Sequence, residues 1–145
     1  MKGLIQRVKR ASVTIDNKLY SEIKQGILVL LGVEKGDNEE NANKLADKIC
    51  KLRIFEDEAG KMNKSVQDIN GEILVVSQFT LLGDCKKGTR PSFDKAELPQ
   101  RANELYEYFT NLIREKNIPV KTGEFGAMMD VELINDGPVT FMLEF

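Results

Sequence analysis

The fold is decided by the run Glu72-Ile73-Leu74-Val75-Val76-Ser77-Gln78-Phe79-Thr80-Leu81-Leu82, the longest β-like stretch of the chain. Isoleucine, valine and phenylalanine favour strands, and an apolar run of this kind predicts a strand in the middle of a sheet. On a pleated strand Gln78 and Thr80 would share one face, and Ser77 and Phe79 the other. Polar side chains that close an apolar strand need a structural or a chemical reason.

The segment upstream of this run predicts a hairpin, a buried strand and a helix. Polar and apolar residues alternate on both sides of the turn Asp16-Asn17-Lys18, which is typical of a hairpin. Gly26 then opens a buried strand, Ile27 to Val33. Asp37 and Asn38 are good N-cap residues for a helix. Its apolar face would consist of Ala42, Leu45, Ala46 and Ile49. The segment Arg53-Ile54-Phe55 is expected to return to the sheet.

The segment downstream predicts a basic loop, a second helix and further strands. The loop Gly83 to Phe93 contains Pro91 and several basic residues. Pro99 fits the first turn of a helix and Pro119 follows its expected end. The apolar face of this helix would consist of Ala102, Leu105, Tyr106, Phe109, Leu112 and Ile113. The remainder alternates around Asn135-Asp136-Gly137-Pro138. This segment resembles a hairpin turn whose proline starts the next strand at an edge or an irregularity.

These elements predict an α+β fold with one domain spanning residues 1–145. Six or seven strands and two main helices, without regular βαβ alternation, favour a largely antiparallel, barrel-like sheet. The chain has 145 residues, 41% hydrophobic and 30% charged, which is the balance of an ordinary globular domain.

The composition excludes several classes of function. The chain has no histidine, which rules out Ser-His-Asp and Cys-His mechanisms and removes the commonest metal ligand. We expect no metal and no cofactor, and reduced thiols at Cys50 and Cys85. The formal net charge is −2, so any contact with RNA must be local, and no DNA partner is expected. No apolar stretch is long enough to cross a bilayer, and we expect a cytoplasmic protein.

Three features could carry chemistry, and each also has an ordinary structural explanation. Ser77 to Thr80 could line a site or simply satisfy neighbouring backbone groups. Gly137-Pro138 could be an ordinary trans turn, because only about 5–6% of X–Pro bonds in folded proteins are cis. Lys86, Lys87 and Arg90 could bind phosphate or form a solvated loop.

Taken together, these segments resemble the D-aminoacyl-tRNA deacylase family. Ser77-Gln78-Phe79-Thr80 is similar to its Ser-Gln-x-Thr motif, and Asn135-Asp136-Gly137-Pro138 to its Asn-x-Gly-Pro motif, in the same order and at a matching separation. The likeness extends across the chain through segments at Gln6-Arg7-Val8, Gly26 to Val33, Leu52-Arg53-Ile54-Phe55, Gly60-Lys61-Met62-Asn63, Gly88 to Phe93 and Thr122 to Met129. The apolar tail Phe141 to Phe145 departs from the family pattern.

The resemblance implies a homodimer that hydrolyses the ester of D-aminoacyl-tRNA. It implies that Ser77, Gln78, Phe79 and Thr80 line the catalytic pocket, and that Gly137 and Pro138 form a Gly-cisPro motif that excludes L-aminoacyl-tRNA from the other subunit. The residues that would line the substrate pocket or support the motif are Arg7, Phe125, Met129 and Asn135. The residues that would bind the tRNA are Lys86, Lys87 and Arg90. Glycyl-tRNA mischarged on tRNA(Ala) would also be hydrolysed.

A different class of function stays open from the sequence. The same dimer could be a nucleic-acid-binding or protein-interaction module without catalysis. The acidic net charge argues against general nucleic-acid binding.

Overall fold

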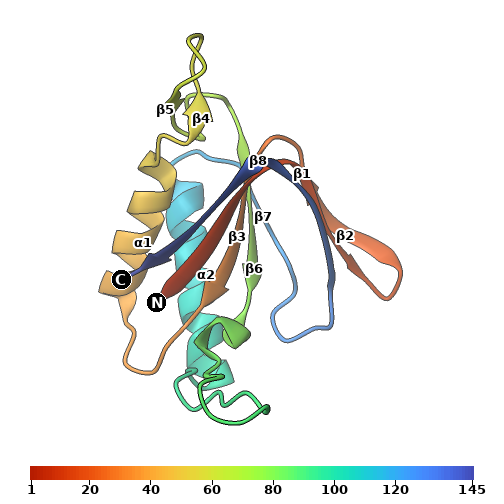
Figure 1. Ribbon diagram of the computed structural model, residues 1–145, viewed down its shortest axis with the longest axis vertical. Helices are drawn as coiled ribbons and strands as arrows, with labels where there is room; N and C mark the ends of the chain where they lie inside the picture. Colours follow the sequence, from red (N-terminus) through yellow and green to blue (C-terminus); the bar gives the residue numbers. More distant parts are fainter.

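A six-stranded mixed sheet carries the fold in the computed structural model, which describes residues 1–145 (Figure 1). Its strand order is β2-β1-β3-β6-β7, and β8 pairs with β1 on the edge that β3 does not use. The strands are β1 (Lys2–Ile15), β2 (Lys18–Ile23), β3 (Gly26–Gly32), β6 (Glu72–Ser77), β7 (Val120–Thr122) and β8 (Asp130–Glu144).

The sheet combines antiparallel and parallel pairs and curls towards a barrel. β1 runs antiparallel to β2, β3 and β8, whereas β6 is parallel to β3 and β7. The Ser21 hydroxyl donates to the Thr122 carbonyl at 2.8 Å, which joins the two ends of the strand order. The predicted α+β fold with a barrel-like sheet and two main helices is therefore confirmed. The parallel pairs arise because helical crossovers connect β3 to β6 and β6 to β7.

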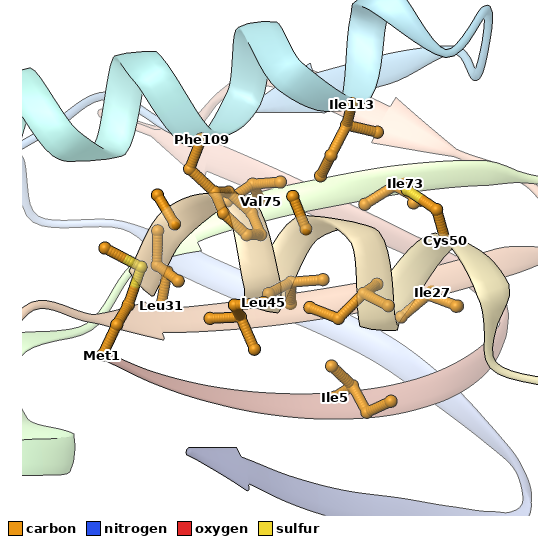
Figure 2. Packing of buried hydrophobic residues seen from close by; sticks show 14 of the residues in the cluster. Met1, Ile5, Ile27, Leu31, Leu45, Cys50, Ile73, Val75, Phe109 and Ile113 are labelled. Carbon is orange, nitrogen blue, oxygen red and sulfur yellow. The ribbon is translucent and has the colours of Figure 1, made fainter. Parts of the chain in front are cut away.

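Two helices cover one face of the sheet and form the larger core. α1 (Glu39–Lys51) and α2 (Pro99–Glu115) lie side by side on this face (Figure 1). Figure 2 shows Leu45 of α1 and Phe109 of α2 packed over strand residues such as Val75. Burial of one such side chain stabilises the fold by about 1.5–3 kcal/mol. None of the helices combines the length and the apolar content that a bilayer crossing requires.

The alternating side chains of β6 divide between two cores. Ile73 and Val75 belong to the cluster under the helices, whereas Leu74 and Val76 belong to a smaller cluster inside the curl of the sheet. This alternation follows from the two-residue period of a strand. The prediction of a central strand is confirmed for this segment.

Both helices begin where the sequence predicts. The Asn38 side chain accepts hydrogen bonds from the backbone N–H groups of Glu40 and Asn41, and the Asn41 side chain accepts one from the Asn38 N–H. This reciprocal pair is a capping box that fixes the start of α1. Pro99 is the first residue of α2, where its missing N–H costs no hydrogen bond.

The strand predicted over Glu72 to Leu82 ends at Ser77, so the prediction is wrong for residues 78–82. The Gln78 N–H donates to the Leu31 carbonyl at 2.7 Å, and the chain then turns into a short 3₁₀ helix, η1 (Phe79–Leu82). Gln78 and Thr80 therefore do not share the face of a pleated strand.

The hairpin predicted at Asn135 to Pro138 is also wrong, because β8 continues through this segment. Gln6 pairs with Thr140 and Val8 pairs with Asn135, so Arg7 alone faces the residues 136–139. Pro138 has no N–H to donate, and the strand accommodates it in a wide bulge. The irregularity expected at the proline is confirmed.

The return of Arg53-Ile54-Phe55 to the main sheet is a third correction. β4 (Phe55–Glu56) pairs only with β5 (Met62–Lys64), and the two form a separate hairpin. The Asp57 carboxylate closes its turn by accepting bonds from the N–H groups of Ala59 and Lys61. These bonds lower the pKa of Asp57 below its usual value.

The parallel pair of β3 and β6 requires glycine at its start. A Cβ atom at Gly26 would lie 1.8 Å from the Glu72 carbonyl oxygen, which belongs to the backbone of the neighbouring strand. A side chain there would push the two central strands apart.

We predict that Gly26→Ala lowers the free energy of unfolding by about 3 kcal/mol, because no side-chain rotation relieves the overlap. Gly3→Ala is the matched control, since its Cβ would meet only the movable ends of Leu45 and Ile49 at 3.3–3.6 Å. Urea unfolding followed by circular dichroism measures both variants. Equal stabilities would contradict this account of the β3–β6 pair.

Candidate functional site

The turn after β6 presents unpaired backbone donors. No acceptor within the chain takes the N–H groups of Phe79 and Thr80, the first two residues of η1. The Phe79 side chain is 55% exposed, and Thr80 is exposed beside it. Two free N–H groups at the start of a helical turn attract an oxygen that carries negative charge. We call Ser77 to Thr80 the β6 turn.

The side chains of the β6 turn do not satisfy neighbouring backbone groups. The Gln78 amide donates to the Thr80 hydroxyl oxygen, and neither side chain bonds to the backbone. Because the Thr80 oxygen accepts this bond, the Thr80 proton is free to be donated to a ligand. No carboxylate or other base is hydrogen-bonded to the Thr80 side chain. The structure therefore argues against the ordinary structural explanation of these side chains.

The basic loop folds against the β6 turn. The backbones of Asp84 and Ser92 exchange two hydrogen bonds of 2.8 and 3.0 Å, which close the loop between them. The Phe79 and Phe93 rings meet edge to face with their centroids 5.0 Å apart. The exposed cations Lys86, Lys87 and Arg90 form no ion pair, so their charge is available to a ligand.

Phe125 and Met129 lie beside the end of β6. Phe125 packs against Tyr106, with ring centroids 5.9 Å apart, and the Tyr106 hydroxyl donates to the Val75 carbonyl at 2.8 Å. Burial raises the pKa of Tyr106 to about 12, so this hydroxyl stays neutral. Met129 packs on the smaller core that contains Val76. The structure thus brings Phe125, Met129, the β6 turn and the basic loop to one end of the sheet, here called the turn cluster.

Arg7 and the bulge of β8 form a second cluster. Arg7 is 5% exposed, and its guanidinium donates to the Asp136 carbonyl at 2.9 Å and to the Ile54 carbonyl at 2.6 Å. The Asp136 carboxylate lies 3.6 Å from the Arg7 Nε. Arg7 thereby joins the bulge to the base of the β4–β5 hairpin.

Asn135 and Gly137 give the bulge its shape. The Asn135 Oδ1 accepts a bond from the Val139 N–H at 2.7 Å. Gly137 has a φ of 141°, and a Cβ atom there would lie 2.7 Å from Val139 Cγ2 and 3.3 Å from Arg7 Nη2. Only glycine fits this position. The Gly137–Pro138 bond is cis, and both residues are exposed. Arg7, Asn135, Gly137 and Pro138 are here called the bulge cluster.

The two clusters lie apart within one chain. At the end of β6, Ser77 pairs with Leu31 of β3. The bulge faces Arg7 of β1, and Arg7 pairs with Ile27 of β3, which in turn pairs with Ile73 of β6. Ile73 lies four residues before Ser77 on β6, which is about 13 Å along the strand. β8 is three strand spacings from β6, or about 14 Å across the sheet. In Figure 1 the middle of β8 lies at the upper end of the sheet, away from the green turn that follows β6.

A polar groove of about 480 Å³ runs between α2 and β7. It touches the turn cluster only at Phe125, and its lining includes the carboxylates of Glu107 and Glu124. Sequence reasoning did not find this groove, because its residues are spread over separate elements without a local motif. Thr140 was not singled out either, although a hydroxyl residue directly behind Gly137-Pro138-Val139 is a signal that could have found it.

Comparisons with known proteins cover the whole chain. The model of the D-Tyr-tRNA(Tyr) deacylase family matches residues 4–144. A D-aminoacyl-tRNA deacylase of Geotalea daltonii is 61% identical over 99% of this chain and 96% of that protein. A D-aminoacyl-tRNA deacylase of Pseudoalteromonas translucida is 62% identical over 99% of each protein.

Two solved structures are similar to this chain over nearly its whole length. A protein described as a c-Myc DNA unwinding element binding protein has a TM-score of 0.95 and 45% identity, and the match covers 100% of this chain and 99% of that one. A probable eukaryotic D-amino acid tRNA deacylase has a TM-score of 0.84 at 18% identity, over 99% and 98% of the two chains, and shows the fold alone. With the family model and the close relatives in agreement, the chain belongs to the D-Tyr-tRNA(Tyr) deacylase family.

Proposed function

We propose that this protein hydrolyses the ester that joins a D-amino acid to the 3′ end of tRNA, releasing the free D-amino acid and the tRNA. The family makes the chain a hydrolase that acts on ester bonds. One observation carries the assignment of the site. The β6 turn offers the free N–H groups of Phe79 and Thr80, together with the Thr80 hydroxyl, at one exposed place.

These donors suit the hydrolysis of an activated ester. When water attacks the ester carbon, the carbonyl oxygen gains negative charge, and preorganised donors stabilise that charge. The bond from the carbon to the 3′ oxygen then breaks, and the leaving oxygen takes a proton. The neighbouring 2′-hydroxyl of the terminal ribose is placed to assist this transfer. The reaction thus proceeds without a histidine.

Thr80 acts as a donor in this scheme rather than as a nucleophile. A threonine nucleophile needs a base to accept its proton. The Thr80 oxygen accepts a bond from the Gln78 amide, which cannot accept a proton in return. Gln78 therefore orients the hydroxyl towards the substrate.

The basic loop is proposed to hold the tRNA. Lys86, Lys87 and Arg90 are exposed, form no ion pair and lie on a loop that packs against Phe79. Phosphates of the acceptor stem are the ligands that such cations fit. Because binding would release counterions, the contribution of this loop should weaken as salt rises.

Selection against L-aminoacyl-tRNA is proposed to require a second subunit. The turn cluster and the bulge cluster are separated along and across the sheet of one chain. In a homodimer, the exposed Gly137 and Pro138 of one subunit can enter the turn cluster of the other. Each site is then completed by the partner.

A rigid backbone segment can separate the two enantiomers by exclusion. D and L substrates carry the same groups and differ only in which side of Cα bears hydrogen. A fixed main-chain carbonyl on one side admits hydrogen and collides with Cβ. A ten-thousandfold preference requires about 5.5 kcal/mol, at about 1.4 kcal/mol per factor of ten. The bonds from Arg7 and Asn135 hold the bulge in place for this role.

Binding to nucleic acid without catalysis is the alternative function. One solved relative, at 45% identity, is described as a DNA unwinding element binding protein. The net charge of −2 favours a local contact with tRNA instead.

The experiment that tests the proposal compares deacylation of D-tyrosyl-tRNA, glycyl-tRNA and L-alanyl-tRNA by the purified protein. We expect hydrolysis of the first two and protection of the third, because glycine has hydrogen on both sides of Cα and passes a steric screen. Glycyl-tRNA charged on tRNA(Ala) would then be a second substrate. Resistance of all three esters would favour the alternative function. If glycyl-tRNA also resisted hydrolysis while D-tyrosyl-tRNA did not, the enzyme would select its substrates by binding the D side chain and not by excluding the L side chain.

Removal of the Thr80 hydroxyl should slow the reaction without stopping it. We expect Thr80→Ala to lower kcat on D-tyrosyl-tRNA on the order of tenfold to a hundredfold, since the backbone donors remain. Thr80→Ser keeps the hydroxyl and serves as the control. Single-turnover kinetics measure both. An acyl-enzyme trapped on Thr80 would make Thr80 the nucleophile, and a folded Thr80→Ala variant with no activity would contradict a scheme in which the backbone donors sustain hydrolysis.

A further inference from the structure

We propose that Thr140 is a positioning residue that sets the stereoselectivity of the enzyme by holding the Asn135 side chain in place. This inference rests on the proposed function, because it concerns the bulge that is proposed to reject L substrates. Thr140 is the first residue of β8 after the bulge to pair again with β1, opposite Gln6.

The Thr140 hydroxyl is the point where two amide side chains meet. Its oxygen accepts a bond from the Asn135 Nδ2 at 2.9 Å and a second, longer one from the Gln6 Nε2 at 3.4 Å. The Asn135 side chain lies on one side of the bulge and Thr140 on the other. The bond between them therefore closes the bulge across its base.

This bond decides which way the Asn135 amide faces. The Asn135 Oδ1 must point to the Val139 N–H, which donates to it at 2.7 Å. The Asn135 Nδ2 then points to Thr140, where only an acceptor satisfies it. If that acceptor is removed, the amide can turn to find water, and the Val139 N–H loses its partner. The residues 136–139 would then be held mainly by Arg7 from the other strand.

A loosened bulge has a selective consequence. A screen that works by exclusion depends on the fixed position of its backbone, whereas the hydrolysis of a D substrate does not use that contact. Loss of the Thr140 acceptor should therefore raise the turnover of the L ester and leave that of the D ester nearly unchanged. A residue needed only for folding would lower both rates together.

The test compares Thr140→Val with Thr140→Ser in the full-length protein. Valine has nearly the shape of threonine but no hydroxyl, whereas serine keeps the acceptor. We expect the ratio of kcat/KM for D-tyrosyl-tRNA over L-tyrosyl-tRNA to fall about tenfold in Thr140→Val, equivalent to about 1.4 kcal/mol. In Thr140→Ser we expect the wild-type ratio. Light scattering and urea unfolding verify that both variants keep the wild-type assembly and stability.

A double-mutant cycle shows whether Thr140 acts through Asn135. Asn135→Ala alone should lower the ratio, and Thr140→Val should add nothing in that background. If the wild-type protein prefers the D ester and Thr140→Val keeps the same preference, the role of Thr140 is refuted and the proposed function stands. The same holds if Thr140→Ser loses as much selectivity as Thr140→Val. A wild-type protein that hydrolyses D and L esters equally would overturn it together with the proposed function.

Discussion

The pairing register of β1 fixes where the two clusters of the candidate site lie relative to each other. This strand holds β3 on one edge and β8 on the other, so its rows fix how the end of β6 and the bulge of β8 lie relative to each other. Arg7 occupies the row where the register of β8 breaks, and its nearly buried guanidinium is bonded to two carbonyl groups there. A buried charge needs such partners, and its loss would leave both carbonyl groups without their donors.

The same register separates two functions that a stereoselective deacylase must combine, namely hydrolysis of the ester and rejection of L substrates. The donors proposed for the developing oxyanion lie at the carboxyl end of β6, and the backbone proposed to exclude L side chains lies in the middle of β8. The proposed homodimer would resolve this separation, because the surface that each chain lacks is present on the other. In this account three hydrogen bonds make the bulge stiff. Arg7 donates to the Asp136 carbonyl, the Val139 N–H donates to the Asn135 side chain, and the Asn135 amide donates to the Thr140 hydroxyl.

Local patterns in the sequence predicted most of the fold. Asn38 and Pro99 marked the starts of both helices, and the apolar run from Glu72 marked the central strand. The end of that strand at Ser77 was missed, because the last bond of its ladder joins the Gln78 N–H to the carbonyl of Leu31, a residue that is distant in the sequence. The bulge was interpreted as a hairpin because a proline after Asp-Gly is typical of a turn. Only the pairing of β8 with β1 before and after this segment shows that the strand continues.

The candidate site was predictable only in part. The motifs around Ser77 and Gly137 identified the family, which the comparisons confirm. The anchoring of Arg7 on the Ile54 carbonyl and the role of Thr140 depend on backbone geometry, which single residue types do not reveal.

Disulfide trapping between two subunits tests the shared site most directly. One chain would carry Phe79→Cys and the other Pro138→Cys, both with Cys85→Ser, because Cys85 is exposed while Cys50 is buried with a pKa raised to about 11. A disulfide requires Cα atoms within about 7 Å, which the register excludes inside one chain. The account predicts a covalent heterodimer under mild oxidation. Chains that associate and fold normally, but never form that bond, would contradict a site built from two subunits.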